Sequence, residues 1–239
     1  MENSAYSRPE VYEIAFSFRD YKIAVDFICD AVRLAGMDQI GSMVELGCGP
    51  GQYCLEFARR GTESAGIDLA PEMVAYARAK AEAERLPCRL LEADMRHVRL
   101  EKPVNLAVCM MATIHLLLTN RDILEHLDSV ADNLTDNGLY LIEMTHPRDM
   151  LTSEKSTGDK WEMERDGIKV TTDWGSDATI DPLTEISDVT VRYKVEHRGE
   201  CETLEGRDPF RLISLGLMRA LIDQNGRFKI AAMYGDLDI

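Results

Sequence analysis

The chain has 239 residues, 45% of them hydrophobic, which is enough for one substantial core or one domain with a large insertion but short for two independent domains. Its 42 acidic residues outnumber its 27 lysines and arginines, and the net charge of −15 repels a phosphate backbone, which argues against a nucleic-acid substrate. The most apolar run, residues 106–118, is too short to span a bilayer, and no basic region followed by an apolar stretch opens the chain, so we expect neither a membrane segment nor a secretory signal.

Residues 10–35 have the pattern of one or two helices and carry aromatic residues at Tyr12, Phe16, Phe18 and Tyr21. From residue 42 to residue 144, short apolar runs alternate with segments of helical periodicity, which is typical of βα units that form a parallel sheet. The runs are almost continuously apolar, as strands covered by helices on both faces require. The predicted strands are residues 43–46, 64–67, 88–92, 104–110 and 139–144.

Two of the intervening helices have recognisable ends. Pro71 stands where a first-turn proline is tolerated, and apolar residues follow it at four-residue spacing. Asn120 is a candidate cap for a later helix, whose apolar residues form one stripe before the sequence Asp-Asn-Gly at 136–138 ends it. Both helices are therefore predicted to be amphipathic and to lie on the sheet.

The pattern changes after the fifth predicted strand. Residues 146–207 are richer in charge and in β-forming residues, and alternating stretches at 168–172 and 189–195 predict antiparallel strands with one solvated face. We expect this insertion, which contains Trp161 and Trp174, to cover the substrate end of the sheet. Asp208 and Pro209 are then expected to open a final helix that Gly226 closes, and residues 228–234 to form a last strand.

A glycine-rich loop, GCGPG at residues 47–51, joins the first predicted strand to a helix that begins near Gln52. Such a loop presents backbone amides to a ligand at a helix N-terminus, and glycine lets the ligand approach closely. Asp68 stands at the tip of the second predicted strand, where a carboxylate can accept hydrogen bonds from both hydroxyls of a ribose. The loop and Asp68 together predict adenosine binding.

Other nucleotide-binding motifs fit this loop less well. The nicotinamide-dinucleotide fingerprint G-x-G-x-x-G needs a third glycine at the position of Gln52. Glu45, two residues before Gly47, would repel a pyrophosphate but attract a cationic ligand. No Gly-Lys-Ser or Gly-Lys-Thr follows the loop, which excludes a P-loop.

Four segments in order resemble class I S-adenosylmethionine-dependent methyltransferases. Residues 44–51 (VELGCGPG) are similar to motif I, and residues 66–73 (GIDLAPEM) to motif II. Residues 92–96 (EADMR) resemble the segment that binds the adenine, and residues 109–116 (CMMATIHL) the strand and loop that line the methionine portion. The resemblance covers residues 40–145 well. It implies an α/β, Rossmann-like fold: a mostly parallel sheet with helices on both faces, here with an antiparallel β insertion over the substrate end.

The resemblance also implies the ligands and the residues that hold them. The cofactor would be S-adenosyl-L-methionine, with S-adenosyl-L-homocysteine as its product and no metal. Asp94 would bind the adenine amine while Met95 packs on the ring, and Arg19, in a stretch similar to the N-terminal lid of small-molecule members such as sugar amine N-methyltransferases, would approach the methionine carboxylate. The expected cofactor-binding residues are Tyr12, Arg19, Glu45, Gly47, Cys48, Gly49, Asp68, Leu69, Asp94, Met95 and Met110.

Methyl transfer from a sulfonium needs the nucleophile, the methyl group and the sulfur to be held in line and away from water. A neutral histidine near pH 7 can accept the proton of an amine or hydroxyl nucleophile. His115 and His146 follow the fourth and fifth predicted strands, at the edge where open α/β sheets bind ligands, and they are the candidate catalytic residues. The alternatives are that His115 packs beneath the cofactor and that His146 shapes the exit from the sheet.

We therefore expect one methyltransferase domain over residues 1–239, with a helical lid at 1–40, a cofactor-binding core at 41–145, a substrate-cover insertion at 146–207, and a final helix and strand at 208–239. Its acceptor would be a small-molecule N or O nucleophile; a regulatory protein that only binds the cofactor is the alternative. Six cysteines without a C-x-x-C pair favour a reduced, cytoplasmic protein. We expect it to be a monomer or a homodimer. A seventh strand, usual in the family, is expected beyond residue 239 or replaced by a strand of the insertion.

Overall fold

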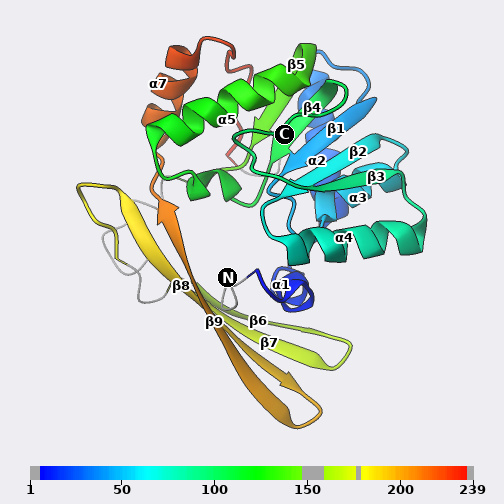
Figure 1. Cartoon of the computed structure of the whole chain (residues 1–239), viewed down its shortest axis with the longest axis vertical. Coiled ribbons are helices and arrows are strands. Elements are labelled where there is room, and N and C mark those ends of the chain that lie inside the picture. The colour runs from blue at the N-terminus through cyan, green and yellow to red at the C-terminus, as the bar shows by residue number, and fades with distance from the viewer. Residues whose placement is uncertain (1–5, 147–158, 176–178, 236–239) are drawn as a thin grey trace.

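The structure is a computed structural model that describes residues 6–146, 159–175 and 179–235. Its strands form two separate sheets, one parallel with helices on both faces and one antiparallel, with a single short helix between them (Figure 1). No helix in these ranges is long and apolar enough to cross a membrane. The expected α/β fold with an antiparallel β-rich segment is confirmed.

The parallel sheet has the strand order β3-β2-β1-β4-β5, and each neighbouring pair runs in the same direction. The order reverses between β1 and β4, so the carboxyl ends of these strands flank the crevice where open α/β sheets bind ligands. The five strands are β1 (Ser42–Leu46), β2 (Glu63–Asp68), β3 (Cys88–Glu92), β4 (Val104–Cys109) and β5 (Leu134–Ile142). Four strands agree with the predicted segments to within about two residues, but β5 begins at Leu134 because α5 (Asn120–Asn133) ends at Asn133, so the prediction that residues 136–138 end this helix is wrong.

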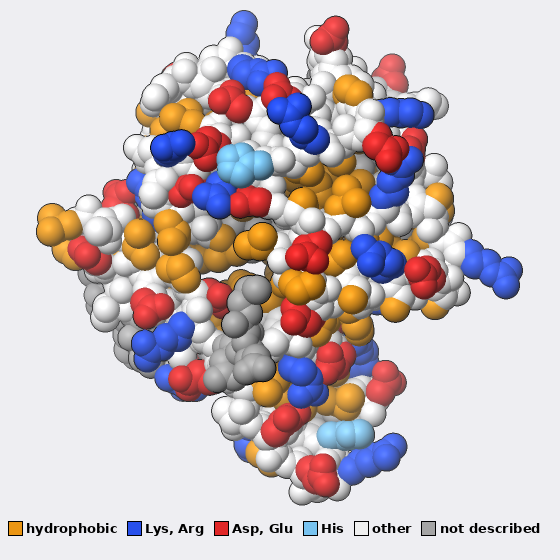
Figure 2. All heavy atoms as spheres, viewed as in Figure 1, with side chains coloured by type: hydrophobic (Ala, Val, Ile, Leu, Met, Phe, Trp, Pro, Cys, Tyr) orange, Lys and Arg blue, Asp and Glu red, His pale blue; other side chains and the backbone are white. Residues whose placement is uncertain are grey.

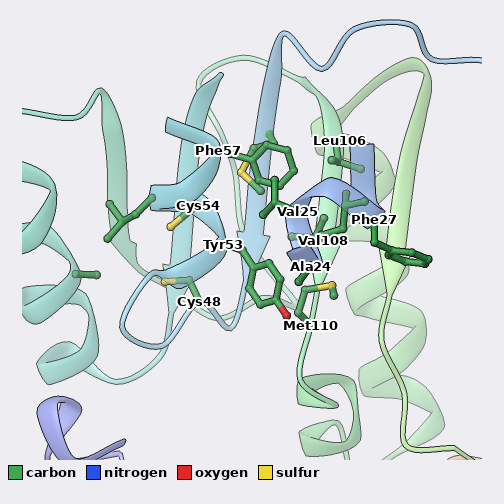
Figure 3. Packing of buried hydrophobic residues seen from close by; sticks show 14 of the residues in the cluster. Ala24, Val25, Phe27, Cys48, Tyr53, Cys54, Phe57, Leu106, Val108 and Met110 are labelled. Atoms are coloured by element: carbon green, nitrogen blue, oxygen red, sulfur yellow. The ribbon is translucent and has the colours of Figure 1, made fainter. Parts of the chain in front are cut away.

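Helices cover both faces of this sheet because successive strand residues point to opposite sides. Met43, Leu106 and Val108 pack against α2, α3 and α4, while Val44 and Ala107 pack against α5 and α7. The two apolar layers are the core that holds the strand ends in place, and Figure 3 shows part of the first layer. The helices are α1 (Pro9–Ala15), α2 (Tyr21–Leu34), α3 (Gln52–Arg59), α4 (Pro71–Glu84), α5 (Asn120–Asn133) and α7 (Leu215–Asn225), with a 3₁₀ turn, η1 (Thr113–Leu116).

Polar side chains fix where several helices begin. Asp20 accepts the amide hydrogens of Lys22 and Ile23 and so caps α2. Asn120 was expected to cap α5, but Thr119 does so, in a reciprocal capping box with Asp122. The prediction was wrong by one residue because the threonine hydroxyl reaches the Asp122 amide and the aspartate reaches back, which satisfies two amides at once.

The antiparallel sheet has the order β6-β7-β8-β9, and its strands are β6 (Asp159–Arg165), β7 (Ile168–Trp174), β8 (Ile186–His197) and β9 (Glu200–Arg211). One face carries Val170, Val189, Val191 and Tyr193, which pack against the apolar side of α1. Helix α1 therefore lies between this sheet and α4 of the parallel domain (Figure 1). The expected antiparallel strands at 168–172 and 189–195 are confirmed.

Two expectations for the C-terminal part are wrong. Asp208 and Pro209 do not open a helix: both lie in β9, and the helix begins at Leu215 after the cap Ser214. Proline is tolerated there because β9 is an edge strand of its sheet, where an N–H on the outer side has no ladder partner to lose. Gly226 ends the helix with a φ of 70°, as expected.

The predicted strand at 228–234 is also wrong. This segment pairs with no described strand and most of its side chains are exposed. It is held by side-chain contacts instead, such as the edge contact of Tyr234 with Phe27 of α2 at a ring-centroid distance of 5.3 Å. An alternating apolar pattern without a partner strand does not form a strand.

Candidate active site

The glycine loop turns sharply between β1 and α3. Gly47, Gly49 and Gly51 have φ angles of 68°, 50° and 79°, in the left-handed region where a side chain is disfavoured. At Gly47 the space is also closed, because an added Cβ would lie 2.3 Å from Cγ2 of Thr113. The loop is therefore built for the close approach of a ligand to the backbone.

Asp68 stands at the end of β2, directly beside this loop. Its Oδ2 accepts the Gly49 amide at 2.7 Å and its Oδ1 accepts the Ala70 amide at 2.9 Å. Burial raises the pKa of this carboxyl, and the amide hydrogen bonds partly offset that effect. The loop backbone thus holds the Asp68 side chain in the wall of a cavity that Gly47, Gly49 and Leu69 also line.

Glu45 is buried beneath the loop, with 4% of its surface exposed, and its Oε2 accepts the Cys54 amide at 2.9 Å. Burial raises its pKa to about 8, and the nearby charge of Asp68 adds to the effect while the amide hydrogen bond opposes it. At neutral pH the carboxyl is therefore mostly protonated in the free protein. A cation bound beside Glu45 would lower its pKa and favour the ionised carboxylate that the sequence analysis assumed.

A small recess of about 30 Å³ lies behind the loop and shares Tyr12, Gly47 and Gly49 with the lining of the main cavity. The hydroxyl of Tyr53 is buried without a hydrogen-bond partner, and in Figure 3 it points toward Met110. A buried phenol without a hydrogen-bond partner is uncommon, so a ligand is expected to supply the partner that the protein does not. The recess is lined by Tyr12, Tyr21, Glu45, Gly47, Cys48, Gly49, Pro50, Gln52, Tyr53, Met110, Met111 and Thr113.

Asp94 and Met95 follow β3 and line the main cavity, as expected. Asp94 forms a close ion pair with Arg96, whose Nη2 lies 2.6 Å from its Oδ2, and the pKa of Asp94 is lowered chiefly by this contact. Arg96 also contacts Asp122 of α5 at 2.6 Å. The adenine-binding candidate is thus ionised and anchored to the start of α5.

Arg19 does not line the main cavity or the recess in the described part of the chain. Its Nη2 pairs with Oε1 of Glu143 at 2.5 Å, and Oε2 of Glu143 accepts the amide of Met111 at 2.9 Å. Arg19 therefore ties the segment between α1 and α2 to the loop after β4. The expected approach of Arg19 to the methionine carboxylate stays a prediction.

The two candidate histidines lie in different surroundings. His115 is fully buried and stacks on Phe210, with ring centroids 4.6 Å apart. Its Nδ1 donates to the Arg211 carbonyl at 2.8 Å and its Nε2 accepts the Thr145 amide at 3.2 Å, while burial lowers its pKa. His146 is exposed. Neither histidine lines the described cavity. Thr145, whose amide His115 accepts and which precedes His146 in the chain, does line it.

The main cavity measures about 1540 Å³ and lies between the two sheets. Its floor is the glycine loop, Asp68 and Asp94, and its roof is the antiparallel sheet with Trp161 and Trp174. In Figure 2, hydrophobic side chains gather around the hollow in the middle of this face. Both tryptophans thus line the cavity that the insertion was expected to cover.

Sequence reasoning missed several lining residues. Tyr53, in the first turn of α3, follows the glycine loop closely enough that its position could have been inferred. Asp208 and Phe210 were assigned to a helix, so their place in the cavity wall was not foreseen. Thr113 lies in the segment 109–116 that the resemblance assigned to the methionine portion, but its contact with Gly47 could not be inferred, because the turn that makes it begins with a left-handed Ala112.

Comparison with known proteins gives one family match. Residues 43–138 match the model of the methyltransferase domain family. This span runs from β1 to β5 and includes the glycine loop, Asp68, Asp94 and His115.

A curated relative is the dTDP-3-amino-3,4,6-trideoxy-alpha-D-glucopyranose N,N-dimethyltransferase of Streptomyces venezuelae, 28% identical over 56% of this chain and 55% of the relative. The chain spans about half the length of the curated relatives it matches. Among solved structures, Streptomyces venezuelae DesVI matches with a TM-score of 0.77 and 21% identity, covering 91% of this chain and 89% of that one. CalS10, an amino pentose methyltransferase from Micromonospora echinaspora solved with its bound cofactor, matches with a TM-score of 0.72 and 20% identity over 90% and 88%.

Proposed function

We propose that this chain, a class I S-adenosylmethionine-dependent methyltransferase by its fold and by the domain that residues 43–138 match, methylates a nitrogen or oxygen nucleophile of a small molecule. The observation that carries the proposal is the cavity between the sheets. Its floor is the glycine loop with Asp68 and Asp94, and its volume of about 1540 Å³ exceeds the few hundred to 1,000 Å³ of a usual single-ligand pocket. A cofactor and an acceptor can lie there side by side.

The residues present suit S-adenosylmethionine. Asp68 is fixed in the cavity floor, where each carboxylate oxygen accepts one backbone amide and can accept a ribose hydroxyl as well, and Asp94 with Met95 suits the adenine. The methionine end would lie against the recess, whose volume of about 30 Å³ leaves room for one polar group, because the Tyr53 hydroxyl there lacks a partner that a carboxylate or ammonium group would supply. Glu45 lies at the same recess and favours a positive charge.

The bound cofactor supplies an activated methyl group, and the protein has to hold the acceptor in line with it and exclude water. The aromatic residues of the roof, Trp161, Trp174 and Phe16, surround the cavity and keep it apolar. Helix α1 closes one side, with Tyr12 lining both the cavity and the recess. These residues provide positioning and desolvation.

We propose that His115 is a positioning residue. Its two ring nitrogens hold the Arg211 carbonyl and the Thr145 amide, which link the roof strand β9 to the end of β5. A ring engaged at both nitrogens and stacked on Phe210 is poorly placed to take a proton from an acceptor. His146 is exposed and stays a predicted candidate base.

Cofactor binding tests the proposal most directly. Calorimetry should give binding of S-adenosylhomocysteine to the wild type, a severe loss for Asp68→Ala, and no change for Asp38→Ala, an exposed aspartate. Absence of heat with the wild type would overturn the function. A labelled-methyl screen over amines, phenols, carboxylates and thiols then separates an enzyme from a regulatory protein, which would bind the cofactor and transfer nothing.

We also propose a cytoplasmic monomer or homodimer. Free thiols at all six cysteines are consistent with a reducing compartment. Size-exclusion chromatography with light scattering decides between the two oligomeric states.

A further inference from the structure

The face of the antiparallel sheet that looks into the cavity carries a carboxylate, Asp208. In the register of β8 and β9, Val189 lies opposite Asp208 and Val191 opposite Gly206. Residues directly opposite each other share a face, so Asp208 belongs to the buried face that packs toward α1 and the cavity. Gly206 beside it has no side chain, and both residues line the cavity.

Asp208 has no partner for its buried oxygen. Its Oδ2 is inaccessible to solvent and accepts no hydrogen bond within the described part of the chain. Burial and the charge of Asp188 both raise the pKa of this carboxyl. Tyr193, 1% exposed on the same sheet face, also has a hydroxyl without a partner. Tyr193 does not line the cavity but Asp208 does, and an unpaired oxygen at a cavity wall indicates that a ligand supplies the missing donor.

The cations of the cavity wall do not neutralise Asp208. Of the described basic residues that line the cavity, each forms an ion pair with another carboxylate, and none pairs with Asp208. Arg96 contacts Asp94 and Asp122 at 2.6 Å, Lys160 contacts Asp173 at 3.0 Å, and Arg207 contacts Asp188 at 3.6 Å. A buried negative charge of this kind is stabilised when a cation enters from outside.

Aromatic rings complete the surroundings. Val191 pairs with Trp174 on one side and with Gly206 on the other, so these three residues share one row across the sheet. Asp208 lies two residues farther along β9, in the next row on the same face. Trp161, Phe16 and Tyr12 line the same cavity. Aromatic faces attract a cationic amine, and a carboxylate accepts its N–H hydrogens. A neutral hydroxyl compound would gain neither the charge pairing nor the ring attraction.

We propose that Asp208 recognises the acceptor by binding its protonated amino group, so that the acceptor is a small aliphatic amine that gives up one N–H proton to this carboxylate before its nitrogen attacks the methyl group. This inference rests on the proposed methyltransferase function and assigns it a substrate class. Asp208 selects the amine through one carboxylate whose only described electrostatic neighbours are anionic or aromatic.

Binding can be measured without turnover, because the chain has two tryptophans and both line the cavity. Protein saturated with S-adenosylhomocysteine is titrated with a set of aliphatic amines and amino sugars, each beside its hydroxyl counterpart, and tryptophan fluorescence is followed. Asp208→Asn keeps the side-chain shape and should weaken amine binding about 10- to 100-fold, the effect of losing one hydrogen bond to a charged group. Glu200→Gln, an exposed carboxylate on the same strand, should bind like the wild type.

The same variants are then compared in labelled-methyl transfer. The inference predicts that Asp208→Asn raises KM for amines about 10- to 100-fold while its affinity for S-adenosylhomocysteine stays within about twofold. Equal binding or methylation of amines and hydroxyl counterparts, or an Asp208→Asn variant like the wild type, overturns the inference and leaves the function standing. Cofactor binding without binding of any amine also overturns it. Failure to bind S-adenosylhomocysteine overturns the proposed function itself.

Discussion

Gly47 is the loop position where a side chain has least room. Gly47→Ala would place a Cβ 2.3 Å from Thr113 and force a left-handed φ of 68° on alanine. We expect the free energy of unfolding to fall by about 1–2 kcal/mol from the backbone alone, with a further loss from the clash, and cofactor affinity to fall with it. Urea unfolding and calorimetry with S-adenosylhomocysteine measure both.

Gly36→Ala is the matched control, because Gly36 has a φ of 94° and nothing within 4 Å of an added Cβ. It should show the backbone cost without the clash, and it should bind the cofactor normally. Equal effects of the two substitutions would show that the space beside Thr113 does not matter.

Glu45 should make stability depend on pH. Its pKa rises from 4.5 to about 8 on folding, so the folded protein holds a proton that the unfolded chain releases. This contribution is complete below about pH 4.5 and is lost as the pH rises through about 8, on the order of a few kcal/mol. The stability of Glu45→Gln should not show this pH dependence. Any stability that the wild type gains over the variant, measured as the difference between their urea midpoints, should therefore decrease as the pH rises. Parallel stability curves would contradict the prediction.

At the level of single residues, the sequence predicted what depends on local chain. The glycine loop and Asp68 are set by neighbouring residues, and the motif spacing located both. The surroundings of His115 could not be inferred, because Phe210 and Arg211 belong to β9. Arg211 is 96 residues away from His115 in the chain. The sequence can therefore identify a histidine as a candidate base, but it cannot show what its ring nitrogens bind.

Among the elements, α1 depends on one buried acid. Glu13 of α1, 7% exposed, accepts hydrogen bonds from Gln52 at 2.6 Å, from Tyr76 at 2.5 Å and from Arg165 at 3.0 Å, and it pairs with Lys80. These partners belong to α3, α4 and β6, so Glu13 joins the short helix to both halves of the molecule. Helix α1 has seven residues, too few to be stable alone.

Glu13→Gln should therefore loosen α1. We expect a loss of about 2–4 kcal/mol in the free energy of unfolding, discounted for the partial exposure of Lys80 and Arg165, and faster amide exchange in α1. Burial raises the pKa of Glu13, but the hydrogen bonds from Lys80, Tyr76 and Arg165 outweigh it and lower the pKa to about 2. The stabilisation is thus present above about pH 4.5 and lost as the pH falls toward 2.

Glu10→Gln, on the same helix, is the control. Its carboxylate is 42% exposed and pairs with Arg8, a contact worth at most about 1 kcal/mol. Amide exchange in α1 that responds equally to both substitutions would rule out Glu13 as the specific link.

The element predictions were correct where periodicity and burial agree. The five parallel strands are continuous apolar runs and were located from the sequence. The error at Pro209 arose because a proline that opens a helix and a proline tolerated in an edge strand have the same local sequence, and only the pairing of β9 with β8 separates them. Pairing partners far along the chain are tertiary information.

For the whole molecule, the cavity joins two sheets that the sequence could describe separately but could not orient. Its floor belongs to the parallel sheet and its roof to the antiparallel one, with α1 between them. A ligand that contacts floor and roof therefore stabilises the arrangement of both. The formal charge of −15 is spread over the exposed surface, where many carboxylates pair with arginines and lysines.

Because a ligand that binds the folded chain alone stabilises it, S-adenosylhomocysteine at about 100 times its Kd should add about 3 kcal/mol and raise Tm by about 5–10 °C for a protein of this size. Scanning calorimetry measures the shift. NAD⁺ at the same concentration should give none, because Gln52 occupies the position of the third fingerprint glycine. A shift with NAD⁺ and none with S-adenosylhomocysteine would mean that the glycine loop holds a dinucleotide, and that the acid beneath it stays protonated beside a phosphate.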